Sequence, residues 1–255
     1  MRGVVLANTE SLHITTKDNL QSDYITSIYR DPRGGVWIGN AEGVSLFDGE
    51  RVRPVVLEDK SGNVAKVRVN RVVGDSLNLV MLATDIGLYT FDNKRNSFTL
   101  SYSSEKAILS LLREDDYILL GRSDGLVLLD KKHNKETLFL PQERVVNILR
   151  HPSGTIYILT TTSLYSIATL HGEVLPHIEE LLETQGGIFS DMAIADQSIY
   201  ISQERKDSHS LQRYDISSSQ VKSLPNIENT IIRSLCFNED KTELYCATDG
   251  DGVIV

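Results

Sequence analysis

Polar side chains in predicted loops are the residues of this chain with the types and spacing to bind a ligand. The loops that join predicted second and third strands carry charges of both signs and many hydrogen-bonding groups. Together with the loops that enter first strands, they give this predicted ligand-binding set: Asn40, Glu42, Asp85, Arg122, Asp124, Arg144, Glu204 and Asp249. The entry loops also hold Asp23, Tyr24 and Lys106. The set suits a neutral or weakly charged carbohydrate, although solvated loops in general have a similar composition.

Catalytic and metal-binding motifs are weak. The sequence has no H-E-x-x-H motif, no Gly-rich phosphate loop and no C-x-x-C pair. The six histidines fall mostly in predicted outer strands or turns, where solvated positions are expected. Acidic turns at 115–116 and 249–252 offer oxygen ligands for calcium, but tight turns need the same residues. We predict no catalytic residue, no metal site and no cofactor; a carboxylate pair assembled from distant segments stays open.

Short strands joined by tight turns must position these polar residues. Apolar and β-branched runs cover Ile25–Tyr29, Val36–Gly39 and Val44–Phe47, and Asp, Pro and Gly residues separate them. Three such strands form an antiparallel meander. A sheet of this size is too small to be stable alone in water, so it needs copies of itself to pack against.

Copies of the second strand recur along the whole chain. The same position in each copy is taken by Gly39, Ala83, Gly121, Thr160, Ser202 and Ala247. A β-only unit that recurs about every 40 to 45 residues is typical of a propeller blade. We predict structural roles for the single tryptophan and for five glycines: Trp37, Gly39, Gly43, Gly87, Gly121 and Gly125. Trp37 is predicted to be a wedge between blades, with a solvent-facing platform for sugar rings as the alternative.

The predicted fold class is all-β, a β-propeller of four-stranded antiparallel blades that forms one domain over residues 1–255. Five complete blades are expected at 25–57, 67–100, 107–140, 145–178 and 188–224, with partial blades at 1–16 and 230–255. In the fifth blade a long charged loop is predicted at 203–207, and helix spacing at 177–183 is an alternative to strand. We expect a fragment of a seven-bladed ring, and therefore a longer protein. Unpaired strands at its ends predict dimerisation or aggregation.

Composition argues against two classes of partner. The net charge is −9 and the basic residues are scattered, which disfavours nucleic acid. No apolar run approaches the roughly 20 residues of a spanning helix, so we predict no membrane insertion by this segment. Cys236 and Cys246 flank a predicted turn. They are interpreted either as two small apolar residues in adjacent strands or as a cross-strand disulfide. Zinc is not expected, because no histidine lies near either thiol in the sequence.

The stretch from Ile25 to Gly49 resembles the two-component regulator propeller repeat. Four features carry the resemblance: a strand containing S-I, an acidic turn with Gly, the W-I-G string and the G-V-S-L-F-D run. It implies the periplasmic sensor region of a hybrid two-component protein, which detects a carbohydrate breakdown product or another small molecule. It also implies further propeller and signalling domains, including a histidine kinase, downstream of a segment that is not itself an enzyme. A lyase-like or lactonase-like propeller enzyme and a protein-interaction scaffold are the alternatives.

Overall fold

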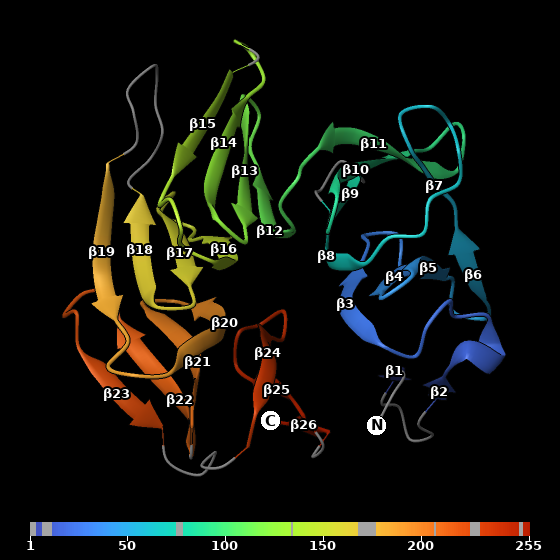
Figure 1. Cartoon of the computed structure of the whole chain (residues 1–255). Coiled ribbons are helices and arrows are strands. Elements are labelled where there is room, and N and C mark those ends of the chain that lie inside the picture. Colours follow the sequence, from blue (N-terminus) through green and yellow to red (C-terminus); the bar gives the residue numbers. More distant parts are fainter. Residues whose placement is uncertain are drawn as a thin grey trace. The chain divides into compact units, whose positions relative to one another are not determined.

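The computed structural model describes residues 4–6, 12–74, 79–133, 135–167, 177–206, 208–224, 230–249 and 252–255 of the 255-residue chain. Within these residues every regular element is a β-strand except one 3-10 turn, η1 (Thr16–Asp18) (Figure 1). The chain divides into two units, Met1–Arg113 and Glu114–Val255, which are described separately.

The first unit contains the predicted meander. Its first full sheet has the strand order β3 (Ile25–Arg30), β4 (Val36–Asn40), β5 (Gly43–Phe47) and β6 (Val52–Val55), all antiparallel. The turn between β3 and β4 forms because Asp31 accepts hydrogen bonds from the backbone N–H groups of Arg33 and Gly35, at 2.8 and 3.1 Å. The local turn chemistry therefore produces the hairpin that the sequence predicts.

The second sheet of this unit has one strand more than expected. It contains β8 (Val69–Gly74), β9 (Val80–Thr84), β10 (Gly87–Asp92) and β11 (Ser97–Ser103), and β7 (Leu57–Glu58) pairs in parallel with β11. The segment that leaves the first sheet thus covers the outer edge of the second. The remaining strands of the unit are β1 (Val4–Leu6), which pairs with β2 (Leu12–Ile14), and β12 (Ile108–Arg113).

The second unit repeats the antiparallel pattern. Its strands are β13 (Tyr117–Arg122), β14 (Gly125–Asp130), β15 (Lys135–Phe139); β16 (Val145–Arg150), β17 (Ile156–Thr160), β18 (Ser163–Ile167), β19 (Ile178–Glu183); β20 (Ile188–Ala195), β21 (Ser198–Arg205), β22 (Ser208–Asp215), β23 (Val221–Leu224); and β24 (Ile232–Phe237), β25 (Leu244–Thr248), β26 (Val253–Ile254). Neighbouring strands in each group pair in chain order (Figure 1).

Two local predictions in this unit are wrong. The helical alternative at 177–183 is wrong, because Ile178–Glu183 forms strand β19 and its pairing with β18 outweighs a weak helical spacing. Most of the charged segment predicted as a long loop is strand, since β21 continues to Arg205 and pairs with β22 from Ser208; Asp207 of that segment lies outside the described residues. The charged residues therefore extend a hairpin.

Sheets of antiparallel strands in chain order confirm the predicted fold class, all-β with four-stranded blades. Six blades follow β2 along the described part of the chain. Whether a seven-bladed ring is completed, and whether the chain is a single domain, stay predictions.

The core lies between successive sheets. In the first unit, one apolar cluster combines Trp37 and Val44 of the first sheet with Val72, Leu82 and Phe98 of the second. Strands β9 and β17 are buried along their full length, as strands covered on both faces should be. The first two sheets therefore bury each other's facing sides.

Gly39 lies where β4 of the first sheet closely approaches β8 of the second. A Cβ atom added there would lie 2.8 Å from Cγ1 of Val69 and 3.1 Å from Cγ2 of Val72. We expect Gly39→Val to lower the free energy of unfolding by about 1–3 kcal/mol, because overpacked cores must shift backbone or rotamers. Urea denaturation followed by circular dichroism measures this loss. An unchanged midpoint would show that the sheets are not in contact at Gly39.

Candidate functional site

A β-bulge marks the first strand of five blades, close to the end at which the chain enters that strand. The pairing register shifts after the first residue of β3, β8, β16 and β24, and after the second residue of β20. The extra residue at each bulge, which has no partner in the pairing register, is Thr26, Asn70, Val146, Ser190 or Arg233. Bulges redirect side chains and are common beside functional sites. Because the strands are antiparallel, the loops between second and third strands lie at this same end, which we call the bulged end.

The register also corrects one predicted repeat position. Gly39, Ala83, Ser202 and Ala247 each lie opposite the residue that follows the bulge. In the fourth blade that place belongs to Leu159, which pairs with Asn147, and not to Thr160. Thr160 instead occupies the last position of its strand, as Asn40 and Thr84 do.

Three polar bulge residues hold neighbouring blades together. Thr26 Oγ1 donates to the carbonyl oxygen of Val69. Asn70 Nδ2 donates to Ile108 O at 2.9 Å, and Ser190 Oγ donates to Ile232 O at 3.1 Å. In each case the acceptor is the first residue of the next first strand. These bonds fix the blades against each other at the bulged end.

In the first unit, four side chains meet in what we call the rim cluster: Tyr24, Arg68, Asn70 and Asp85. The Arg68 guanidinium carbon lies 5.1 Å from the centroid of the Tyr24 ring. Arg68 Nε donates to Asn70 Oδ1 at 3.2 Å, and Asn70 Nδ2 donates to Asp85 Oδ1 at 2.9 Å. Tyr24 is 54% exposed. The cluster therefore offers an aromatic ring, a cation, an amide and a carboxylate to solvent.

Asn40 and Glu42, the other predicted ligand residues of this unit, have local partners. Asn40 is buried; its Nδ2 donates to Gln21 Oε1 at 3.2 Å, and its Oδ1 accepts from the Glu42 N–H at 2.9 Å. Glu42 pairs with Lys66 at 3.3 Å. Asn40 therefore shapes the loop, and only Asp85 of the predicted set lies in the rim cluster.

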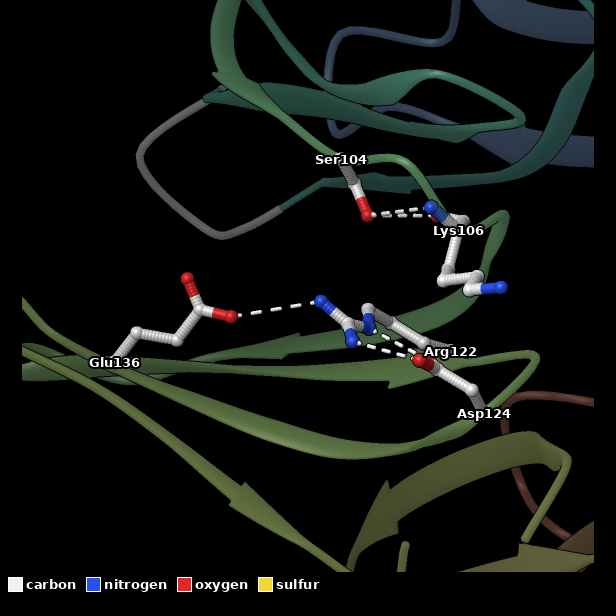
Figure 2. Close-up of polar contacts among 5 residues, drawn as sticks. All are labelled: Ser104, Lys106, Arg122, Asp124 and Glu136. Carbon is white, nitrogen blue, oxygen red and sulfur yellow. Dashed lines mark hydrogen bonds and ion pairs between the residues drawn. The ribbon is translucent and has the colours of Figure 1, made fainter. Parts of the chain in front are cut away.

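In the second unit, Arg122 and Asp124 bind each other. Arg122 Nε and Nη2 lie 2.8 and 2.9 Å from the two oxygens of Asp124, and Nη1 lies 3.4 Å from Glu136 Oε1 (Figure 2). The string Gly121-Arg122-Ser123-Asp124-Gly125 has the G-x-S-x-G spelling of a hydrolase nucleophile elbow. That elbow requires a strand-to-helix turn, whereas these residues join β13 to β14 in a hairpin. The structure therefore gives Ser123 no elbow.

Glu204 and Asp249 come together through Arg233, which sequence reasoning missed. Arg233 lies 3.7 Å from Glu204 Oε2 and 2.6 Å from Asp249 Oδ2. The hydrogen bond from Arg233 lowers the pKa of Asp249. Arg144 is exposed, and no partner of its guanidinium is found among the described residues; its carbonyl accepts from the Thr161 N–H at 3.0 Å.

Asp191 is a buried carboxylate that the sequence did not single out. It is 3% exposed and lies on β20. Asn147 Nδ2 donates to its Oδ1 at 2.6 Å, and Ser234 Oγ and the Leu235 N–H both donate to its Oδ2 at 2.9 Å. Asp191 therefore ties together three first strands, β16, β20 and β24.

The cysteine and histidine predictions need correction. Cys236 pairs with Tyr245 across the hairpin, so Cys246 is one position out of register and faces the opposite side. Both thiols are free, and the disulfide alternative is wrong. His151 is buried and not solvated, with Nε2 2.7 Å from Asp196 O.

Among the described residues, no group of three His, Cys, Asp or Glu side chains could hold a metal ion. No helix among those residues is long and apolar enough to cross a membrane.

Residues 19–42, which include Tyr24, match the family model described as two component regulator propeller. The predicted resemblance is confirmed by this match. No curated protein is similar to the chain at the level of sequence.

Solved structures extend the resemblance to the fold of the chain. The extracellular domain of the putative one component system BT4673 from B. thetaiotaomicron is 20% identical, with a TM-score of 0.72; the match covers 90% of this chain and 31% of that one. The corresponding domain of the putative hybrid two component system BT3049, also from B. thetaiotaomicron, is 19% identical, with a TM-score of 0.71 and coverage of 95% and 34%. The Dos1 propeller is 9% identical, with a TM-score of 0.58 and coverage of 88% and 66%. The chain shares the propeller fold and spans about a third of the length of the two B. thetaiotaomicron domains.

Proposed function

We propose that this chain is a non-catalytic, ligand-sensing part of a longer two-component signalling protein. The rim cluster is the observation that carries the proposal, because it presents an exposed aromatic ring beside fixed polar groups. Tyr24, its aromatic member, lies inside the segment that matches the two component regulator propeller model. The likeness to extracellular domains of a one component and a hybrid two component system supports a periplasmic place and a histidine kinase elsewhere in the protein.

The proposed ligand is a carbohydrate. Sugars bind through an aromatic face that covers their C–H groups and through planar polar groups that bond their hydroxyls. Tyr24 supplies the ring, Asp85 supplies a carboxylate, and Asn70, whose two N–H groups are already used, supplies its amide oxygen. Further propeller and signalling domains are proposed partners, and dimerisation through unpaired strands stays a prediction.

The proposed signal is a shift between conformations. Asn70 belongs to the rim cluster and also bonds the first residue of β12. A ligand that binds one arrangement of Asn70 more tightly would favour the blade arrangement that goes with it. The signal passed on would be that change in population.

Tyr24→Ala tests the proposed function. We expect calorimetric titration with a panel of neutral and acidic di- and trisaccharides to show binding to the intact chain. The variant should bind about five- to tenfold more weakly, since a stacked ring contributes on the order of 1 kcal/mol. Its melting temperature should barely change, because Tyr24 is exposed.

Val64→Ala is the matched control, because Val64 is 74% exposed and lies beside β7. It should bind the panel as the unmodified chain does. If no member of the panel binds the intact chain, the proposed function is wrong.

A further inference from the structure

We propose that the rim cluster recognises an oxyanion carried by the sugar, either a uronate carboxylate or a sugar sulfate. This inference rests on the proposed function and specifies its ligand. The juxtaposition behind it is an arginine that is held in place by three protein groups while its two terminal nitrogens stay open.

Contacts on three sides fix Arg68. The Tyr24 ring lies against the guanidinium, with 5.1 Å from its centroid to the guanidinium carbon. The Nε–H is used by Asn70 Oδ1 at 3.2 Å. The Arg68 carbonyl accepts from the Asp85 N–H at 3.3 Å, which anchors the backbone. An arginine fixed in this way loses little further entropy when it binds.

The open side of Arg68 has the shape that an oxyanion needs. Neither Nη atom has a hydrogen-bond partner among the described residues, and the side chain is exposed. A guanidinium edge with two free N–H donors matches a carboxylate or sulfate through two parallel hydrogen bonds. Asn70 fixes the plane of this edge, because its own amide is held by Asp85 and Ile108.

The charges around Arg68 leave it without an anionic partner. Glu42 pairs with Lys66, and the Oδ1 atom of Asp85 is occupied by Asn70. Elsewhere in the same unit, Arg53 and Arg95 pair with carboxylates. Arg68 itself has no carboxylate partner among the described residues, and its side chain is exposed. A ligand oxyanion would complete the cluster.

The experiment uses calorimetric titration with digalacturonate, its methyl ester, galactose 6-sulfate and inorganic phosphate. We expect digalacturonate or galactose 6-sulfate to bind, and whichever binds identifies the oxyanion. The methyl ester should bind about 10- to 100-fold more weakly than the acid, which is the usual effect of losing charge-assisted hydrogen bonds. Arg68→Lys should also weaken acid binding at least about tenfold, because lysine keeps the charge and loses the paired donors.

Arg95→Ala is the control, since Arg95 is exposed and pairs with Glu58 away from the cluster; it should leave binding unchanged. Equal affinity for acid and ester, or unchanged binding in Arg68→Ala, would overturn the inference. Phosphate binding as tightly as the acidic sugars would also overturn it, because the sugar would then contribute nothing. Binding of neutral sugars that depends on Tyr24, without a preference for acids, would overturn the inference and leave the proposed function intact. No binding of any carbohydrate would overturn both.

Discussion

Replacing Trp37 by alanine is expected to lower the free energy of unfolding by about 3–5 kcal/mol, the usual cost of truncating a buried tryptophan. Trp37 is 1% exposed, and its ring meets Phe91 and Phe98 edge-on at centroid distances of 5.0 and 5.5 Å. Its Nε1–H donates to Asp31 Oδ2 at 3.2 Å. It is thus a wedge between two blades, and the alternative of a solvent-facing sugar platform is wrong.

Urea denaturation followed by circular dichroism measures the loss, because the variant has no tryptophan to report fluorescence. Trp37→Phe is the matched variant, since it keeps an aromatic ring and loses the bond to Asp31. It should retain more stability than Trp37→Ala. A loss below about 1 kcal/mol in Trp37→Ala would mean that the two blades do not pack through this ring.

Replacing Asp191 by alanine is expected to cost about 3 kcal/mol or more. Hydrogen bonds to a charged group contribute about 1.5–3 kcal/mol each, and removing the carboxylate leaves buried donors without partners. The affected donors are Asn147 Nδ2, Ser234 Oγ and the Leu235 N–H. Because these groups come from the first strands of other blades, the damage should extend beyond β20.

Hydrogen exchange at the Leu235 amide measures this effect directly, alongside the denaturation midpoint. Asp191→Asn is the matched variant: it keeps the shape but turns an N–H group toward one of the donors, so it should lose less stability than Asp191→Ala. Unchanged protection of the Leu235 amide in Asp191→Ala would contradict the role of Asp191 as a tie between blades.

The strands could be predicted from the sequence because their signals are local. The run from Val36 to Gly39 is apolar and is preceded by an Asp-Pro and Gly-Gly turn, and the structure places β4 there. Strand β7 could not be predicted in this way. Its two residues pair with β11, about 40 residues later in the chain, and no local pattern encodes that partner.

The sequence predicted which loops carry the polar residues, but it did not predict the hydrogen-bond and ion-pair partners of those residues. Loop position correctly indicated which residues gather near the ends of second strands. It did not reveal that Asn40 is used by Gln21, or that Arg233 joins Glu204 to Asp249. Arg233 is a bulge residue, and a bulge changes the register by one residue and redirects a side chain, which no local sequence pattern specifies.

A two-dimensional NMR titration with the tightest-binding carbohydrate of the panel tests most directly whether the bulged end is the ligand end. We predict that the largest chemical-shift changes fall at Tyr24, Arg68, Asn70 and Asp85. Changes concentrated at the turns of the other end, around 31–35 and 92–96, would contradict the assignment of the bulged end as the binding surface.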